Sequence, residues 1–260
     1  DAFPQPPGLP GDKDRYLKFV DDIYQSDAYH SLSIEGYSVT PELIDRVRQG
    51  DWNPQADEQD RQNRDALAAR GYWQAFQSVK KSVNSILDGA PAGALAQDQH
   101  RDWYRELFGP SVAAGILRAG ALAGYRSHPV YLRGSWHVPP RSETVADGMN
   151  ALFALLEKEE EPAVRAVLGH WLVGYVHPYP DGNGRMARFL MNAMLASGGY
   201  PWTIVRVEDR TRYLACLETA SVEMNVTPFA AFLAERVQWS SEQAGGASGA
   251  LTKTDFPARD

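Results

Sequence analysis

Residues 177–188 place a base, a carboxylate, two glycines and two arginines within one short segment, which reads HPYPDGNGRMAR. Asp181 offers a hard oxygen ligand of the kind that Mg²⁺ takes alongside phosphate and water. If a helix begins at about Gly184, the unpaired N–H groups of its first turn and its dipole favour an anion in the Gly-Asn-Gly turn. His177 would then stand across the turn as a base. The composition of this segment predicts a phosphate site.

The two arginines of the segment, Arg185 and Arg188, are three residues apart. On a helix they lie on one face, where they could fork two neighbouring phosphate groups. The apolar residues after the motif repeat at helical spacing on the opposite face, and we interpret them as core. Core packing does not explain the arginines, which supports a role in anion binding.

Two helices joined by a loop are predicted to position this segment. Apolar residues recur at three- and four-residue spacing from 164 to 175, behind Pro162, which suits a first helical turn. Pro178 ends that helix directly after His177. Upstream, Thr40 and Pro41 predict another helix start, and apolar residues mark a longer helix over 72–86.

Other motif interpretations are weaker. A Gly-x-Gly-x-x-Ala pattern at 182–187 has the form of a dinucleotide fingerprint, with Glu208 at about the expected distance, but the preceding segment has helical rather than strand periodicity. No Gly-Lys-Ser/Thr follows, which argues against a Walker loop. His170 and His177 could share a helix face, but no further His or Cys cluster completes a zinc set, so we interpret His170 as structural.

The segment is similar to the signature of the Fic family, His-Pro-Phe-x-Asp/Glu-Gly-Asn-Gly/Lys-Arg-x-x-Arg, with Tyr179 in place of the usual Phe. The resemblance covers roughly residues 28–235. It implies an all-α fold, in which a compact helical bundle carries a small β-hairpin over the active site and an N-terminal helical extension. We expect an N-terminal helical region at 1–95, a catalytic core at 96–239 and a disordered tail at 240–260.

The resemblance also implies a reaction, the transfer of AMP from ATP to a Ser, Thr or Tyr hydroxyl of a protein. His177 would take the proton from the hydroxyl, which attacks the α-phosphate in line and releases pyrophosphate. Asp181 would hold Mg²⁺ between the α- and β-phosphates. The remaining phosphate contacts implied are Asn183 at the α-phosphate, the amides of Gly182 and Gly184 around the anion, and Arg185 and Arg188 at the β/γ end.

A second match is the hexapeptide SLSIEG, from Ser31 to Gly36, which resembles the family's inhibitory-helix motif Ser/Thr-x-x-x-Glu-Gly/Asn. Taken alone, it is also what an ordinary helix end looks like. Beside the Fic signature it implies an inhibitory helix over about residues 24–36, in which Glu35 pairs with Arg188 and denies this guanidinium to the γ-phosphate. One buried ion pair is large enough to act as a switch, because about 1.4 kcal/mol changes the competent population tenfold.

The third matching piece is the segment 130–140, which reads VYLRGSWHVPP. Its β-branched and aromatic residues around Arg-Gly-Ser, closed by two prolines, predict a short hairpin on the surface. In Fic proteins the equivalent hairpin docks the target by pairing its edge with target backbone. The residues that the resemblance assigns to target docking are Leu132, Arg133, Gly134, Ser135, Trp136 and His137.

Downstream, residues 212–222 predict a helix, and Thr227 caps the start of another. Family members use this region for the adenine pocket, so Tyr213 is a candidate for a base contact, with a buried core tyrosine as the alternative. Some members carry a tyrosine where Leu214 stands and an asparagine near Ser221. These differences leave open whether the pocket prefers adenine over another base.

Charge and composition restrict the partners. A net charge of −7 and a pI near 5.4 argue against a nucleic-acid surface. Cys216 is the only cysteine, so no intrachain disulfide can form. No apolar run reaches the length of a membrane span and no cleavable signal is visible, so we expect a cytoplasmic protein without membrane contact. The expected partners are ATP and a protein with an accessible hydroxyl, and a homodimer is left open.

The favoured function is that of an autoinhibited protein adenylyltransferase. Transfer of UMP, phosphocholine or phosphate on the same fold is one alternative, and deAMPylation, with Glu35 positioning a water, is another. An inactive peptide-binding module is the alternative from a different class. The intact set of His177, Asp181, Asn183 and Arg188 argues against that module, because docking a peptide does not need all four.

Overall fold

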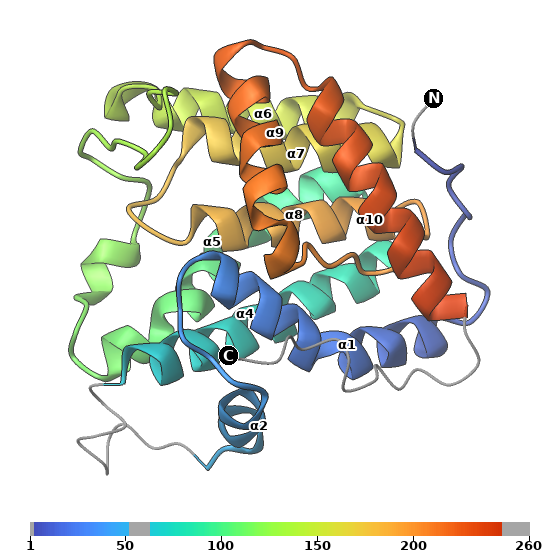
Figure 1. Cartoon of the computed structure of the whole chain (residues 1–260), viewed down its shortest axis with the longest axis horizontal. Helices are drawn as coiled ribbons and strands as arrows, with labels where there is room; N and C mark the ends of the chain where they lie inside the picture. Colours follow the sequence, from blue (N-terminus) through green and yellow to red (C-terminus); the bar gives the residue numbers. More distant parts are fainter. Residues whose placement is uncertain (1–2, 52–62, 246–260) are drawn as a thin grey trace.

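The computed structural model describes residues 3–51 and 63–245 of the 260-residue chain, and this part of the chain is helical without any strand (Figure 1). The α-helices are α1 (Lys13–Ile34), α2 (Pro41–Gln49), α4 (Arg64–Leu87), α5 (Ala92–Ala113), α6 (Val145–Lys158), α7 (Pro162–Val176), α8 (Asn183–Ala196), α9 (Arg210–Val222) and α10 (Thr227–Gly245). Short 3₁₀ turns lie at η1 (Ala119–Leu122), η2 (Ser142–Thr144) and η3 (Val207–Asp209). The all-α prediction is confirmed.

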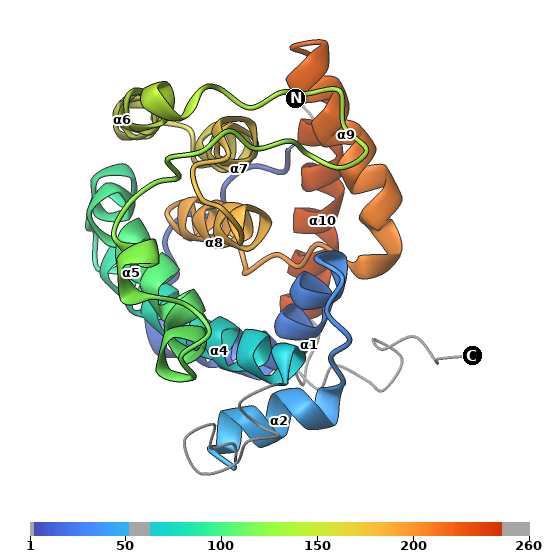
Figure 2. The same cartoon turned by 90° about the vertical axis from the view of Figure 1, so that its left-hand side faces the viewer.

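Helix α8 lies at the centre of the bundle, with α1, α4, α5, α7 and α10 around it (Figure 2). All of its residues except Gly184 are buried. The sequence predicted an amphipathic helix with Arg185, Arg188 and Asn192 on a polar face, so the structure corrects this point. Because α8 is enclosed on all sides, its polar side chains must find partners inside the protein. Asn192 does so by exchanging two hydrogen bonds with the backbone of Thr203.

An aromatic cluster joins the N-terminal helices to α8. The ring centroids of Tyr24 and Phe76 are 5.0 Å apart, and those of Tyr72 and Phe189 are 4.9 Å apart. Such pairs are stabilising beyond the area that they bury. The expected N-terminal region and the expected catalytic core therefore share one hydrophobic core, which fixes α1 against α8.

Two expected boundaries differ from the structure. α1 begins at Lys13, well before residue 24, because the Asp12 carboxylate accepts a hydrogen bond from the Arg15 N–H and caps the helix there. α10 continues to Gly245, past residue 240, where a tail was expected to begin. The rest of that expected tail, 246–260, lies outside the described residues. None of the described helices is both long and apolar enough to cross a membrane.

Candidate active site

The loop between α7 and α8 carries the predicted phosphate motif. α7 ends at Val176, and His177 turns the chain with a left-handed φ of 50°. The Asn183 side chain then closes the loop, accepting from the Tyr179 N–H at 2.9 Å and donating to the Tyr179 carbonyl at 2.8 Å. The Asn183 carboxamide, which we expected at the α-phosphate, thus holds the loop. Helix α8 begins at Asn183, within one residue of the predicted start.

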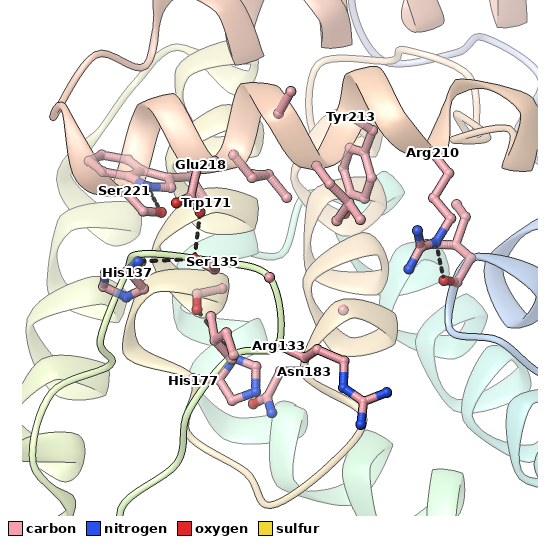
Figure 3. A pocket seen from close by; sticks show the side chains of 18 of the residues that line it. Arg133, Ser135, His137, Trp171, His177, Asn183, Arg210, Tyr213, Glu218 and Ser221 are labelled. Carbon is pink, nitrogen blue, oxygen red and sulfur yellow. Dashed lines mark hydrogen bonds between the residues drawn. The ribbon is translucent and has the colours of Figure 1, made fainter.

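A cavity of about 540 Å³ opens beside this loop, a volume typical of small-molecule sites (Figure 3). Its walls come from the end of α1, the segment 130–140, α7, the start of α8, and α9. It brings together most of the residues that the sequence singled out. These are Glu35, Leu132, Arg133, Gly134, Ser135, His137, His177, Asn183, Gly184, Arg188 and Tyr213.

His177 is suited to accept a proton in this cavity. Burial lowers its pKa, and the nearby charge of Arg126 lowers it further, while the Gly174 carbonyl and the Glu35 charge act in the opposite direction. The net shift favours the neutral ring. Nδ1 lies 3.4 Å from the Gly174 carbonyl oxygen, and a proton on Nδ1 leaves the lone pair of Nε2 as the acceptor.

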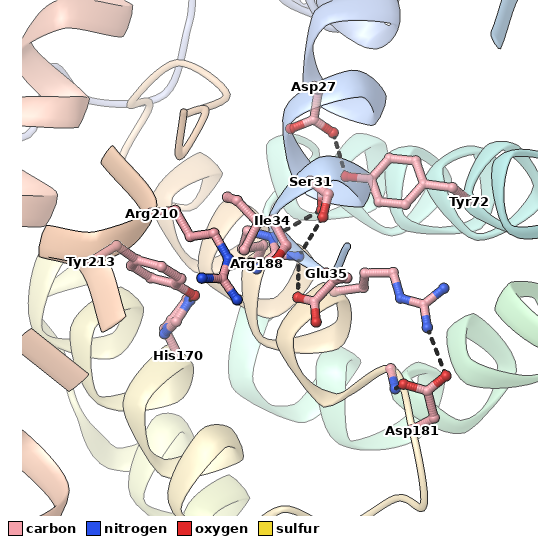
Figure 4. A network of polar contacts seen from close by, with 12 residues as sticks. Asp27, Ser31, Ile34, Glu35, Tyr72, His170, Asp181, Arg188, Arg210 and Tyr213 are labelled. Carbon is pink, nitrogen blue, oxygen red and sulfur yellow. Dashed lines mark hydrogen bonds and ion pairs between the residues drawn. The ribbon is translucent and has the colours of Figure 1, made fainter. Parts of the chain in front are cut away.

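Arg188 is held by the end of α1 (Figure 4). Its Nη2 donates to Glu35 Oε1 at 2.7 Å and to the Ser31 carbonyl at 3.0 Å, and its Nε donates to Ser31 Oγ at 2.9 Å. The Arg188 side chain is 5% exposed and that of Glu35 is 28% exposed. The predicted contact between Glu35 and Arg188 is present, and Gly36, with a φ of 84°, turns the chain away directly after it.

The Glu35 carboxylate also covers the start of α8. A side chain at Gly184 would overlap Glu35 Oε1, so only glycine leaves room for the carboxylate there. Nη1 of Arg188, buried beside the same point, has no hydrogen-bond partner among the described residues. An anion is favoured at a helix N-terminus by the backbone amides and the dipole. The chain's own carboxylate therefore lies where the predicted phosphate site would place an anion.

The charges of this pair stabilise each other. Burial alone would raise the pKa of Glu35, but the charges of Arg188 and Arg185 lower it overall. Burial alone would lower the pKa of Arg188, but the Glu35 charge contributes to a net rise. Both shifts favour the ionised pair, as expected when two buried charges compensate each other.

Asp181 and Arg185 lie outside this cavity and line a second one, of about 420 Å³. Arg185 Nη2 is 3.3 Å from Asp181 Oδ2, and Asp181 Oδ1 accepts the Gly182 N–H at 2.6 Å. The Gly182 amide is therefore not free for a phosphate, and Arg185 and Arg188 face different cavities. Their spacing had suggested that the two arginines share one phosphate site, but the structure places them at two different cavities.

Asp181 is compatible with a magnesium ion. Its side chain is 61% exposed and keeps unused acceptor capacity beyond its two protein donors. Within residues 3–51 and 63–245, no group of three or more His, Cys, Asp or Glu side chains could hold a metal. One exposed carboxylate suits Mg²⁺, which takes few protein ligands and is bound largely through phosphate and water.

The segment 130–140 turns where the sequence predicted, at Arg133 and Gly134. The Ser135 N–H donates to the Leu132 carbonyl at 3.2 Å, and Gly134 has a φ of 77°. However, no strand forms in this segment, so the predicted β-hairpin is corrected to a turn without a strand ladder.

Side chains and carbonyls of the bundle hold this turn in place of a strand partner. Glu218 on α9 accepts the Trp136 N–H at 2.7 Å and the Ser135 hydroxyl, and His137 Nε2 lies 2.8 Å from the Tyr175 carbonyl. The Trp136 side chain is 87% exposed. Sequence reasoning did not identify Glu218, because nothing in its local sequence indicates a contact with the turn.

Arg126 is a second residue that the sequence did not indicate. It is 4% exposed, and its guanidinium donates to the carbonyls of His177 at 2.7 Å, His128 at 2.9 Å and Pro140. One side chain thus ties the backbone of His177 to both ends of the segment that covers the cavity. No spacing rule predicts such a residue, since its partners are carbonyls brought together only by the fold.

On the side of the cavity expected to hold adenine, polar side chains are engaged in internal contacts. Tyr213 is 2% exposed, and its hydroxyl lies 2.8 Å from His170 Nε2, so His170 has the structural role that we expected. The Ser221 hydroxyl accepts the Trp171 indole N–H at 3.1 Å. The Tyr213 hydroxyl is therefore engaged with the core, while its ring lines the cavity.

Arg210 adds a positive charge to the cavity that the sequence did not single out. Its Nε donates to the Ile34 carbonyl at 2.9 Å, at the last residue of α1. The guanidinium lines the same cavity as Arg133 and Arg188. Three arginines around one cavity give it a capacity for anions that the two carboxylates, Glu35 and Glu218, only partly offset.

The chain is similar to known proteins in both sequence and fold. The model of the Fic/DOC family matches residues 94–195. The protein adenylyltransferase Fic of Nematostella vectensis is 32% identical over 224 residues, which make up 83% of this chain and 47% of that relative. The chain thus spans about half the length of this curated relative. The protein adenylyltransferase Fic of Drosophila virilis is 36% identical over 115 residues, 43% of this chain and 23% of that relative.

Solved structures show the same fold. Fic-1 (residues 134–508) of C. elegans superposes with a TM-score of 0.70 at 21% identity, covering 89% of this chain and 71% of that one. A Fic-domain-containing signaling protein from Bacteroides thetaiotaomicron superposes with a TM-score of 0.67 at 21% identity, with 90% of each chain covered.

Proposed function

Because the chain carries a Fic/DOC domain, we propose that it is an autoinhibited protein adenylyltransferase, which transfers AMP from Mg-ATP to a Ser, Thr or Tyr hydroxyl of a target protein. The observation that carries the proposal is the position of Glu35. Its carboxylate pairs with Arg188 and lies over the first turn of α8, where the triphosphate would otherwise bind. The activity carried in the name of the relatives supports the choice of AMP transfer.

The bond changes follow from the proposed roles. The target hydroxyl oxygen attacks the α-phosphorus of ATP, the bond from the α-phosphorus to the bridging oxygen breaks, and pyrophosphate leaves. The hydroxyl proton passes to Nε2 of His177, which the lowered pKa keeps neutral and ready to accept it. Arg126 holds the His177 carbonyl and so fixes where the ring stands.

The phosphates would be bound by the first turn of α8 and by Arg188. The unpartnered Nη1 of Arg188 is available to a phosphate oxygen, and release of Glu35 would also free the N–H of Nη2 that does not bind the Ser31 carbonyl. Asp181 also lines the other cavity, but its carboxylate is exposed rather than buried, and it would hold Mg²⁺, which when bound would neutralise charge on the phosphates. Arg185 faces the other cavity, so Arg188 is the arginine of the motif that we assign to the triphosphate.

Inhibition in this proposal is a competition between two anions for one guanidinium. The carboxylate and a γ-phosphate cannot occupy the same space beside Gly184. The resting protein therefore favours the state in which Glu35 is bound. A change of about 1.4 kcal/mol in this balance alters the competent population tenfold.

The target would approach along the turn at Arg133 and Gly134. The Trp136 N–H is already donated to Glu218, so target backbone would have to use other groups of the segment. The exposed Trp136 and Tyr131 side chains, at 87% and 81% exposure, offer apolar contacts there.

Intact-mass spectrometry tests the proposal. Glu35→Gly protein is incubated with Mg²⁺ and each of the common nucleoside triphosphates, with and without a cell lysate as a source of targets. We expect addition of the AMP mass to the chain or labelled AMP in lysate proteins with ATP, weak addition by the unsubstituted protein, and none in a Glu35→Gly, His177→Ala double variant. A Glu35→Gly, His128→Ala variant, which removes an exposed histidine, is the matched control and should remain active.

Other outcomes distinguish the alternatives. An adduct from UTP alone would indicate UMP transfer in place of AMP transfer. Loss of AMP from a modified protein, faster with the unsubstituted chain than with Glu35→Gly, would indicate deAMPylation. No adduct with any donor and no removal of AMP would contradict the proposed function.

A further inference from the structure

The second cavity, of about 420 Å³, is not explained by the proposed reaction. It lies on the other side of the motif loop, where α4, α5 and η1 supply apolar walls that include Leu67, Leu107 and Leu122. Its volume lies in the range of small-molecule sites, and such sites combine apolar walls with a few placed polar groups.

Arg185 is a buried charged group at this cavity. Its side chain is 1% exposed, and the carbon at the centre of its guanidinium lies 5.2 Å from the ring centroid of Tyr37 and 5.1 Å from that of Phe108. Its Nε has no hydrogen-bond partner among the described residues, and its contact with Asp181 is long, at 3.3 Å. A buried donor without a partner is costly, so this arrangement indicates an acceptor that binds from the cavity.

The charges that line the cavity favour an anion. Arg64 also lies over the Tyr37 ring, with its guanidinium carbon 4.7 Å from the centroid, and it lines the cavity together with Arg185. Among the described residues that line the cavity, Asp181, whose side chain is 61% exposed, is the one carboxylate. Two guanidinium groups therefore face one exposed carboxylate.

We propose that this cavity is a binding site for a small amphipathic anion, with an apolar body against the α4, α5 and η1 walls and a single carboxylate or sulfonate group on Arg185. Three aromatic residues, Tyr37, Tyr104 and Phe108, are among those that line the cavity, and they suit an apolar body with an aromatic ring. This inference concerns binding alone and does not rest on the proposed transfer of AMP.

The cavity is connected to the inhibitory contact at two points. Tyr37 follows Glu35 by two residues, and the Phe108 ring lies where a side chain at Gly182, the residue before α8, would stand. The Glu35 carboxylate also lies in the field of Arg185, whose charge contributes to lowering the pKa of Glu35. An anion on Arg185 and the charge of Glu35 therefore repel each other, so removal of that charge should tighten anion binding, and the coupling is reciprocal.

Two fluorescent probes test the site, 8-anilinonaphthalene-1-sulfonate and its uncharged analogue N-phenyl-1-naphthylamine. We expect the sulfonate to bind saturably at one site per chain, at least about tenfold tighter than the uncharged probe, a difference of about 1.4 kcal/mol. Ala121→Trp, at an exposed position that lines the cavity, should abolish this binding by filling the space. Ala123→Trp, exposed and outside the cavity, is the matched control and should leave it unchanged.

Two further variants test the role of charge. Arg185→Gln should weaken the sulfonate probe without affecting the uncharged one, and Glu35→Gln should tighten the sulfonate probe by about fivefold. Circular dichroism melts identify any variant that is not folded. If Arg185→Gln or Glu35→Gln is not folded, the comparison of Ala121→Trp with Ala123→Trp tests the site without them. Equal affinity for the two probes, unchanged binding to Ala121→Trp, or competition between the sulfonate and ATP on Glu35→Gln protein would each overturn the proposal.

Discussion

A buried carboxylate, Asp27, lies on the same face of α1 as the two residues that hold Arg188. Asp27, Ser31 and Glu35 follow one another at four-residue spacing, and the Tyr72 hydroxyl donates to Asp27 Oδ2 at 2.6 Å. Burial raises the pKa of Asp27 to about 6, although the Tyr72 hydrogen bond and the Arg188 charge act in the opposite direction. The fold thus penalises the charged form of Asp27 relative to the unfolded chain, and the Arg188 charge offsets only part of this penalty.

We predict that Asp27→Asn stabilises the protein at neutral pH. Since the folded state raises the pKa of Asp27 above its ordinary value of 3.8, stability from this group is present at low pH and is lost as pH rises through about 6. The free energy of unfolding of Asp27→Asn relative to that of the unsubstituted protein should rise by about 3 kcal/mol between roughly pH 3 and pH 7. Urea titrations of the two proteins across this pH range measure this difference.

The comparison must be made between variants at each pH, because another buried group opposes the effect. Burial lowers the pKa of His170 from 6.5 to about 3. The folded protein therefore loses stability through His170 as the pH falls below 6.5, the pKa of an ordinary histidine. Both proteins contain His170, and its contribution cancels in the difference. A difference between Asp27→Asn and the unsubstituted protein that does not vary with pH would contradict the prediction.

At the scale of the elements, the Arg126 guanidinium holds together the motif loop and the segment that includes the turn at Arg133 and Gly134. The carbonyls that Arg126 binds belong to the end of α7 and to both ends of the segment from residue 128 to 140. Its charge also contributes to lowering the pKa of His177. Arg126 therefore acts on His177 in two ways, by holding its backbone and by favouring its neutral ring, and we regard it as a positioning residue.

We predict that Arg126→Gln raises the pKa of His177, whereas Arg126→Lys, which keeps the charge, leaves it nearly unchanged. Both variants should lower the free energy of unfolding by about 3 kcal/mol, because neither satisfies all the carbonyls that the guanidinium binds. Titration of the His177 ring by NMR measures the pKa without any need for activity. Arg118→Gln, at an exposed arginine of the preceding loop, is the control, and an unchanged His177 pKa in Arg126→Gln would refute the electrostatic part of this role.

The elements also show where sequence reasoning succeeds. The ends of α7 and α8 follow from local rules, since Pro162 begins one helix, Pro178 ends it and glycine precedes the next. The motif at 177–188 was identifiable for the same reason. The strand expected in segment 130–140 is absent, and its Trp136 N–H is bound by the side chain of Glu218, a partner distant in sequence.

Contacts between distant residues account for what the sequence could not predict. Helical spacing placed Arg185 and Arg188 on one face, but the two cavities on either side of the motif loop separate their guanidinium groups. Arg126 and Arg210 act through carbonyls that only the folded chain brings within reach. The pairing of Glu35 with Arg188 could be anticipated because a resemblance related the two motifs, whereas spacing alone carries no such information.

For the whole molecule, the contact between Glu35 and Arg188 joins the end of α1 to α8, two elements that are distant in the sequence. Glu35 and Arg188 are 153 residues apart, and the packing of α1 and α4 on α8 brings them together. Because the N-terminal helices share the core of the domain, release of Glu35 does not require that they separate from it. Glu35 is the first residue after α1, so a change confined to the residues after Ile34 would release the carboxylate from Arg188, while Ser31 keeps its hydrogen bonds to the guanidinium.

The initial rate of AMP transfer by Glu35→Gln protein tests the central claim most directly. Glutamine keeps the size of the side chain and removes only its charge, so Arg188 becomes available to the triphosphate. We predict a rate at least about tenfold above that of the unsubstituted protein, corresponding to about 1.4 kcal/mol. Glu106→Gln, at an exposed glutamate of α5, should leave the rate unchanged. Equal rates for Glu35→Gln and the unsubstituted protein, with both proteins folded and transferring AMP, would contradict the claim that Glu35 inhibits by holding Arg188.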